Sequence, residues 1–385
     1  MTTSMEPCYY FDHAATTRVL PEAAQAATEA MTEAFGNPSS LYRLGTQAAR
    51  AVEEHRTQVA QALGCKAEEV YFTSGGTEGD NWAIAMAVHL GRHKGKHIIT
   101  TAIEHAAVVE PCKALEHQGY EVTYLTPDAQ GHIRLEDLEA ALRPDTVLVS
   151  MMLVNNETGA VQPVAEAAQL LRRKKSAALL HTDAVQGFLK IPFTPKGLGV
   201  DLLTISGHKI GAMKGSGALY LRAGLRGVPL LRGGGQEKGL RSGTEATPQI
   251  AALAAAATLG RQQLEDHQAH LTDLKTYALD TFRRVLPSLV VVSPGDAPHI
   301  CAISLPGYPS QVVVRYLSDQ GFCLSAGSAC HRGKASHVYA ALGLSKAVRD
   351  GMLRVSFGPE NTRQQVDLLA QALVRATQEL VPASR

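Results

Sequence analysis

The chain has 385 residues, of which 45% are apolar, and carries 37 Lys and Arg against 36 Asp and Glu. Because a single hydrophobic core stops growing at roughly 250–300 residues, this length predicts two domains. A formal net charge of +1 and the lack of a long basic block disfavour nucleic acid or an anionic membrane surface as a partner. No segment reaches the roughly 18 apolar residues of a membrane span and no leader-like run opens the sequence, so we expect a cytoplasmic protein.

The cysteines are spread singly along the chain, at Cys8, Cys65, Cys112, Cys301, Cys323 and Cys330. They form no CxxC pair and no Cys/His spacing typical of zinc, so we predict neither a disulfide framework nor a metal site. Most are expected to be small buried hydrophobes. Cys323 lies close enough to Cys330 in sequence to act as a relay.

From about residue 20 to 225, helical patterns alternate with short apolar runs, the pattern of an α/β sheet covered by helices. Amphipathic helices are predicted over 21–35 and 44–63, the first of them opened by Pro21. Several of the predicted strands are apolar throughout, as parallel strands buried on both faces should be. These strands are 70–75, 97–101, 121–125, 146–153, 177–183 and 202–206.

An Ala-rich helical stretch near 246–284 leads into apolar runs at 289–294 and 300–306, followed by short alternating elements. We place a smaller α+β domain in this part of the chain. The predicted division is 14–258 for the large domain, and 1–13 with 259–385 for the small domain. The Gly-rich, charged loop 231–245 just before this stretch has a length that is often functional.

A glycine-rich turn joins the predicted strand 70–75 to a helix. Gly75, Gly76 and Thr77 would direct backbone N–H groups and a hydroxyl at a ligand above the turn, where a phosphate would fit. An ordinary strand-to-helix turn explains the same residues equally well. The run matches neither GxGxxG nor GxxxxGK[ST], so it does not indicate a dinucleotide or a nucleoside triphosphate.

Two further polar residues end predicted strands. Asp183 closes AALLHTD, where it would either cap the next helix or pair with a charged ligand, and Lys209 lies in ISGHKIG, where surface placement is the alternative. Open α/β sheets bind ligands at the carboxyl ends of their strands. An anion site, an acid and a lysine together fit pyridoxal phosphate, which needs a Schiff-base lysine and an acid at its pyridine nitrogen.

Nine motifs then follow one another along nearly the whole chain: DHAATT, FGNPSS, TSGGTEGDN, EHAAV, NNETG, HTDAVQ, SGHKIG, RSGTE and SAGSAC. This series resembles that of the NifS/IscS-like cysteine desulfurases, in the class V branch of the fold-type I pyridoxal phosphate enzymes. The resemblance implies a mostly parallel seven-stranded sheet between helices, a smaller α+β domain, and a homodimer.

The resemblance also implies a role for each matching residue. Lys209 would bond to the cofactor and then move the substrate's Cα proton, His105 would stack on the cofactor ring, and Asp183 would pair with the pyridinium nitrogen. The other cofactor contacts would be Asn156 and Gln186 to the ring oxygen O3′, and Gly76, Thr77, Ser206, His208 and, from the partner protomer, Thr244 to the phosphate.

Arg354 in LRVSFG matches the arginine that clamps the substrate carboxylate, a task suited to a planar, bidentate, permanently charged group, with Asn156 beside it. Cys330 matches the nucleophile: SAGSACHRGKASH is small and polar, and the cations that follow favour the thiolate. The thiolate would take the substrate sulfur, which leaves alanine and a persulfide. HRGKASHVYAALGL after Cys330 departs from the longer Ser-rich segment of the IscS pattern, so IscS partners are not transferred.

The predicted function is therefore conversion of L-cysteine to L-alanine, with the sulfur passed to an acceptor protein for iron–sulfur cluster assembly or for tRNA or cofactor thiolation. A selenocysteine lyase uses the same fold and need not employ an enzymic thiol. A class V aminotransferase would make keto acids without Cys330. A metal or Fe–S scaffold built on the thiols is the non-catalytic alternative, and the scattered cysteine spacing disfavours it.

Overall fold

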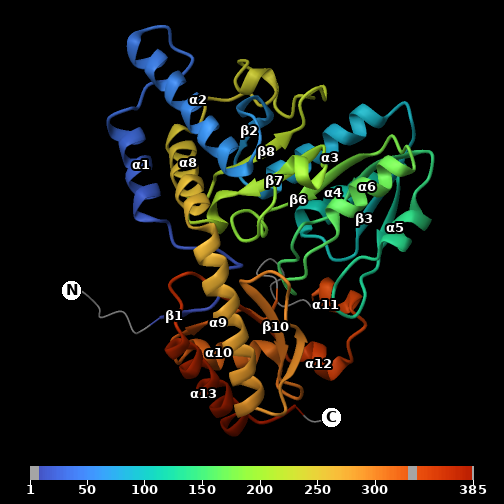
Figure 1. The fold of residues 1–385 in the computed structure, drawn as a ribbon, viewed down its shortest axis with the longest axis vertical. Helices are drawn as coiled ribbons and strands as arrows, with labels where there is room; N and C mark the ends of the chain where they lie inside the picture. The colour runs from blue at the N-terminus through green and yellow to red at the C-terminus, as the bar shows by residue number, and fades with distance from the viewer. Residues whose placement is uncertain (1–7, 328–335, 384–385) are drawn as a thin grey trace.

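A seven-stranded mixed sheet forms the centre of the larger part of the chain (Figure 1). The computed structural model describes residues 8–327 and 336–383. Strand β8 runs antiparallel to both of its neighbours and the remaining pairs are parallel, which confirms the predicted α/β fold. The strands in spatial order are β2 (Val70–Thr73), β8 (Gly217–Leu221), β7 (Leu202–Ser206), β6 (Leu179–Asp183), β5 (Thr146–Ser150), β3 (His97–Thr101) and β4 (Glu121–Leu125).

Both faces of this sheet are covered because its strands are apolar at consecutive positions. Leu202 packs with the helices of one face and the next residue, Leu203, with those of the other, as alternating side chains of a strand must. One face is covered by α3 (Gly76–Gly91) and α4 (Ala106–Glu116), and the opposite face by α2 (Arg43–Leu63), α6 (Val164–Arg173) and α8 (Thr247–Gln262), with α1 (Pro21–Thr32) packed on α8.

A second core surrounds a small antiparallel sheet in the order β12 (Met352–Ser356), β10 (Ile300–Ser304), β9 (Val290–Ser293). Helix α9 (Leu264–Val285) follows α8 directly and carries the chain from the large sheet to this part (Figure 1). With it pack α10 (Ser310–Ser318) and α13 (Arg363–Glu379). The chain start joins here, because β1 (Tyr9–Tyr10) pairs in parallel with β11 (Phe322–Cys323) and Phe11 is fully buried in this core. The division at residues 14 and 259 stays a prediction.

Short helices complete the described chain: α5 (Leu135–Ala141), α7 (Pro195–Leu198), α11 (His337–Ala341), α12 (Lys346–Asp350), and the 3-10 turns η1 (Ala67–Glu69), η2 (Gly207–Lys209) and η3 (Glu237–Gly239). β2 and β5 end two and three residues earlier than predicted, and β6 begins two residues later. The predicted helix 246–284 is two helices that meet at Gln263. Strand β8 was not predicted, because its five residues begin with Gly217 and show no alternation of apolar and polar side chains. Within the part of the chain that the structure describes, no helix is long and apolar enough to cross a membrane.

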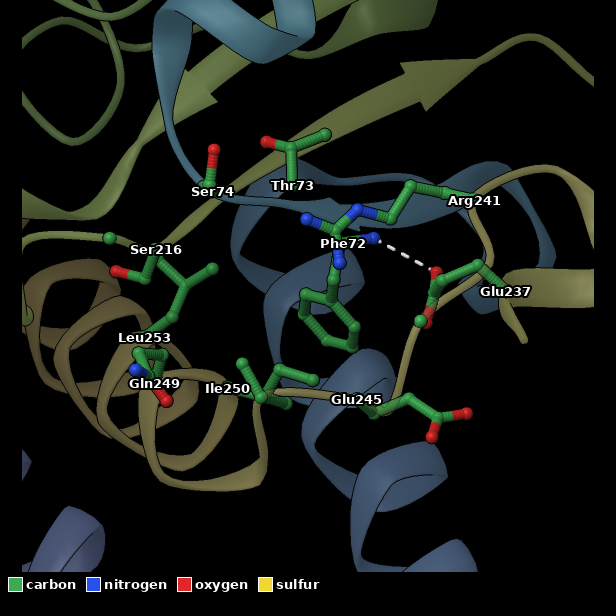
Figure 2. A pocket seen from close by; sticks show the side chains of 14 residues that line it. Phe72, Thr73, Ser74, Ser216, Glu237, Arg241, Glu245, Gln249, Ile250 and Leu253 are labelled. Carbon is green, nitrogen blue, oxygen red and sulfur yellow. Dashed lines mark hydrogen bonds between the residues drawn. The ribbon is translucent and has the colours of Figure 1, made fainter. Parts of the chain in front are cut away.

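A buried ion pair ties α2 to the Gly-rich loop 231–245. Arg56 donates from Nη1 and Nη2 to the two carboxylate oxygens of Glu237, each at 2.8 Å, and only 3% of either side chain is exposed. Glu237 Oε2 also accepts the backbone N–H of Phe72 at 2.9 Å, the bond drawn in Figure 2. The loop is therefore held against the sheet through one carboxylate with three hydrogen bonds.

Replacing Glu237 by Ala should lower the free energy of unfolding by about 3–5 kcal/mol, because it leaves the Arg56 guanidinium buried without its charge partner. Urea denaturation measures this change. Glu53→Ala is the matched control, since Glu53 binds the same arginine from an exposed position, and it should cost less than about 1 kcal/mol. Equal losses in the two variants would contradict a dominant role for the buried pair.

Candidate active site

One cavity of about 230 Å³ lies at the carboxyl ends of β5, β6 and β7. This is the edge at which an open α/β sheet binds ligands. Of the predicted site residues that the structure describes, all except Thr244 line the cavity, namely Gly76, Thr77, His105, Asn156, Asp183, Gln186, Ser206, His208, Lys209 and Arg354. The structure thus brings together residues that are up to 278 positions apart, Gly76 to Arg354.

The start of α3 forms the anion-binding side of the cavity. Gly75 precedes the helix with φ +147°, a backbone conformation that L side chains rarely adopt. No side-chain hydrogen bond caps this helix end among the described residues, so the first N–H groups of α3 are available to an anion. A Cβ built on Gly75 would lie 3.7 Å from Ser206 Oγ, which places that hydroxyl beside the turn.

Lys209 enters the cavity from the 3-10 turn η2 that follows β7. Its Nζ donates to the backbone oxygens of Ala14 at 2.6 Å and Ala15 at 2.7 Å. His208 meets the same N-terminal segment, with Nδ1 3.1 Å from Thr16 Oγ1. Burial and the neighbouring Lys209 charge lower the pKa of His208 to about 4, so its imidazole is neutral at pH 7.

Asp183 provides a buried carboxylate at the end of β6. Its Oδ1 accepts the N–H of Val185 at 2.8 Å. Burial raises the pKa of Asp183 to about 7, and the charge of Asp80 on α3 contributes to this rise. Asp80 is itself 1% exposed, and its Oδ1 lies 3.5 Å from His181 Nε2, too long for a good hydrogen bond. Two buried carboxylates therefore share this side of the cavity.

Arg354 faces the cavity from β12 and is 1% exposed. Its Nη2 forms an ion pair with Asp12 Oδ1 at 2.7 Å, and Nη1 donates to the backbone oxygen of Asn156 at 2.9 Å. Its Nε is buried and has no hydrogen-bond partner among the described residues. An unpaired buried guanidinium N–H is costly, so this group suits a carboxylate ligand.

His105 and Gln186 are both fixed by neighbouring groups. His105 caps α4, and its Nδ1 accepts the N–H of Ala107 at 3.1 Å, so a neutral ring carries its proton on Nε2. Gln186 donates from Nε2 to the backbone oxygen of Ala14 at 2.9 Å, and its Oε1 lies 3.4 Å from His299 Nε2. Both side chains are held in place while lining the cavity.

Comparisons with known proteins fit this arrangement. Residues 9–369 match the family model of the class-V aminotransferases. The chain is 39% identical to the cysteine desulfurase IscS of Methanosarcina thermophila, over 96% of this chain and 92% of the relative. It superposes on a solved NifS-like protein with a TM-score of 0.91 and 34% identity, covering 96% and 99% of the two chains. The solved complex of SspA with cysteine matches with a TM-score of 0.77 and 34% identity, over 92% and 99%.

The chain belongs to the class-V aminotransferase family, among its NifS/IscS-like cysteine desulfurases. This family depends on pyridoxal phosphate, and the residues present fit that cofactor. The uncapped start of α3 and Ser206 suit its phosphate, Lys209 suits its aldehyde carbon, and the buried Asp183 suits a protonated ring nitrogen.

One described site residue, Thr244, lies away from the cavity. Thr244 is exposed on the Gly-rich loop and does not line the cavity of this protomer. Its neighbours Gly243 and Glu245 line a separate hollow of about 80 Å³ together with Arg241, Phe72 and Ser74 (Figure 2). Cys330 and the cations after it lie outside the described residues.

Sequence reasoning missed several groups that shape the site of this desulfurase. The backbone oxygens of Ala14 and Ala15 hold Lys209, and Asp12 holds Arg354. Asp80 also lines the cavity. The motifs DHAATT and TSGGTEGDN contain these residues, and an aspartate just before the apolar run of α3 was a usable signal for Asp80.

The pKa of Asp183 predicts how the stability of the cofactor-free protein depends on pH. A carboxyl whose folded pKa is raised from 3.8 to about 7 stabilises the fold fully at low pH and loses this contribution as the pH rises through 7. Asp183→Asn should remove this loss, so Tm measured from about pH 4 to 8 should fall less in the variant than in the wild type.

Two further variants make this test specific. Asp80→Asn should move the transition to lower pH, because the Asp80 charge contributes to the raised pKa of Asp183. Asp280→Asn is the control, since this exposed carboxylate should leave the wild-type profile unchanged. A wild-type profile in Asp183→Asn would assign the pH dependence to other groups.

Proposed function

We propose that the chain binds pyridoxal phosphate and converts L-cysteine to L-alanine, with the substrate sulfur taken up as a persulfide on Cys330. The observation that carries this proposal is the convergence of Lys209, Asp183 and Arg354 on one cavity at the carboxyl ends of the sheet. These are the groups needed to attach the cofactor, to hold a proton on its ring nitrogen and to bind the carboxylate of an amino acid.

The bound cofactor supplies an electron sink for the charge that develops at the substrate Cα. Lys209 Nζ holds the cofactor covalently and, once released, moves the proton at Cα. The Ala14 and Ala15 oxygens keep this amine at the cavity. Asp183 would hold the ring-nitrogen proton, Asn156 and Gln186 would bond the ring oxygen O3′, and His105 would stack on the ring. Gly76, Thr77, Ser206 and His208 hold the phosphate.

Arg354 binds the substrate carboxylate through Nε and the N–H groups that Asp12 and Asn156 leave available. Because Asp12 and the Asn156 oxygen fix two corners of the guanidinium, the group keeps one orientation. A guanidinium held in one orientation selects the carboxylate of an α-amino acid and thereby fixes the direction of the substrate's side chain. The solved relative SspA, in complex with cysteine, supports L-cysteine as that amino acid.

The described residues on either side of Cys330 support its role as the nucleophile. Ser325 exchanges two backbone hydrogen bonds with Arg354, at 2.7 and 3.4 Å. On the other side, Ser336 Oγ donates to Glu157 Oε2 at 2.6 Å, and Glu157 follows Asn156 in the chain. Gly327, the last described residue before Cys330, is three positions from it in the sequence. The described residues that flank Cys330 in the sequence are thus bonded to Arg354 and to the neighbour of Asn156, which supports Cys330 as the residue that attacks the substrate.

Mass spectrometry after incubation with L-cysteine tests the persulfide directly. The wild type should carry added sulfur on the Cys330 peptide and release alanine, Cys330→Ala should do neither, and Cys65→Ala should behave like the wild type. Lys209→Ala should form no alanine because the amine that attaches the cofactor and moves the Cα proton is gone.

The outcomes separate the alternative reactions. If Cys330→Ala forms alanine from selenocysteine but not from cysteine, the result agrees with a desulfurase. Unchanged alanine from both substrates would indicate a lyase that needs no enzymic thiol, and keto-acid products would indicate an aminotransferase.

We further propose a homodimer in which Thr244 completes the phosphate site of the partner subunit. Phe35, Leu41 and Tyr42 are 65%, 95% and 63% exposed, an unusual concentration of large apolar side chains. They adjoin the loop that bears Thr244, because Gln236 Nε2 donates to Ser39 Oγ at 3.4 Å. A second copy seated on this face would bury the apolar residues and receive Thr244.

Mixing two inactive variants tests whether Thr244 acts across the dimer. Lys209→Ala and Thr244→Ala homodimers should each be impaired. A mixed dimer contains one site with a native Lys209 from one chain and a native Thr244 from the other, so activity and cofactor binding should return in about half of the sites of that dimer. No recovery, with mixed dimers confirmed by mass, would place Thr244 in its own protomer's site or outside it.

The persulfide would pass to a sulfur-acceptor protein, for iron–sulfur cluster assembly or for tRNA or cofactor thiolation. The cytoplasm remains the compartment that we expect for this reaction.

A further inference from the structure

Two thiols far apart in sequence meet at the edge of the smaller part of the chain. Cys8 Sγ and Cys323 Sγ lie 3.5 Å apart across a separation of 315 residues. Among the cysteines that the structure describes, these two are the pair whose sulfur atoms are in contact. The other described cysteines are less accessible, since Cys112 and Cys301 are buried and Cys65 is half-buried. The exposed Cys8 gives the pair access to solvent.

Strand pairing accounts for this contact. β1 runs parallel to β11, with Tyr10 directly opposite Cys323. Cys8 is two residues before Tyr10 and therefore projects from the same side of the strand, diagonally across from Cys323. The backbone also fixes this register, because Tyr9 N–H donates to the oxygen of Gly321 at 2.8 Å and Phe11 N–H to that of Cys323 at 2.8 Å.

We propose that Cys8 and Cys323 form a reversible disulfide, a modification site that ties the N-terminal strand to the strand leading toward Cys330. A disulfide sulfur pair is about 2.05 Å apart, so the two sulfurs must approach by roughly 1.5 Å. Cys8 precedes β1 and makes no strand pair of its own, so rotation of its side chain and a small backbone shift supply this approach.

A low-molecular-weight disulfide is the oxidant, and the exchange proceeds in two steps. The Cys8 thiolate attacks one sulfur of the oxidant, whose S–S bond breaks and releases one thiolate, leaving a mixed disulfide on Cys8. The Cys323 thiolate then attacks the Cys8 sulfur, which breaks the mixed S–S bond and expels the second thiolate. The two protein thiols lose two electrons and two protons, and the oxidant becomes two thiols.

The second step should be the slow one. Burial raises the pKa of the Cys323 thiol to about 11, and the neighbouring Cys8 thiol adds to this rise. Because few Cys323 thiols are ionised at pH 7, ring closure should become faster as the pH rises toward this value. The proposed substrate is itself a thiol, and two molecules of cysteine would reduce the disulfide while forming one cystine.

The disulfide would act on residues that border the active site. β1 leads to Asp12, whose carboxylate binds Arg354 Nη2, and β11 leads to Ser325, whose backbone pairs with that of Arg354. The covalent link therefore joins the two segments that hold one arginine from two sides. It should suppress local opening of both segments.

Peptide mapping tests the disulfide in the complete protein, treated with oxidised glutathione and then alkylated. Trypsin leaves Cys8 in peptide 1–18 but keeps Cys323 and Cys330 together in peptide 316–332, so a second digestion with chymotrypsin beside Leu324 is needed. We expect Cys8 linked to the Cys323 peptide, with the link lost on reduction. Cys8→Ser should remove the link, and Cys65→Ser should retain it.

Two results would overturn the proposal: a link between Cys323 and Cys330, or glutathione retained on Cys8 without closure even at pH 9. Hydrogen exchange provides an independent readout that does not depend on catalysis. Amides in 9–13 and 322–327 should exchange at least several-fold more slowly in the oxidised wild type than in the reduced protein, and Tm should rise by several degrees. Oxidation should change neither quantity in Cys8→Ser, and an unchanged wild type would also refute the tether.

Discussion

The site depends on a carboxylate that the fold removes from water. Asp183 ends a strand buried between two layers of helices, and Asp80 from α3 adds a second carboxylate nearby. Desolvation and like charge both oppose ionisation, so the pKa of Asp183 rises to about 7. A cationic ring nitrogen at this position would relieve both effects. The same burial that destabilises the ionised protein alone therefore favours the protonated cofactor, and the sheet supplies the rigidity that keeps the carboxylate in place.

The N-terminal segment joins the large sheet to the smaller core beside Lys209 and Arg354. Phe11 packs in the smaller core, Asp12 binds Arg354, and the Ala14 and Ala15 oxygens accept from Lys209. Gln186 donates to the same Ala14 oxygen. One short stretch of backbone therefore sets the distance between Arg354 and Lys209, although Arg354 lies on the small sheet and Lys209 on the turn η2 that follows a strand of the large sheet.

The sequence predicted the sheet and most of the cavity because both depend on local patterns. Apolar runs that end in Asp183 or next to Lys209 reveal strand ends, and parallel strands bring their carboxyl ends to one edge. The partners of these residues could not be predicted in this way. Backbone oxygens at Ala14 and Ala15 have no side-chain signal, and the Arg354–Asp12 pair joins positions 342 residues apart. Strand β8 was missed because an antiparallel neighbour needs only a short connection, which left its five residues without a flanking helix pattern.

In the proposed reaction, Arg354 would link substrate binding to sulfur transfer. Its side chain binds Asp12 and the backbone oxygen of Asn156 and keeps an N–H available for a ligand. Its backbone pairs with that of Ser325, two residues before Gly327. Glu157, next to Asn156, accepts from Ser336 on the far side of the Cys330 segment. The described residues on both sides of that segment are thus bonded to Arg354 and to the neighbour of Asn156, and Arg354 and Asn156 are the residues proposed to orient the substrate carboxylate. A displacement of Arg354 would therefore move the anchor of the nucleophile together with the substrate, which preserves their relative position better than two independent attachments would.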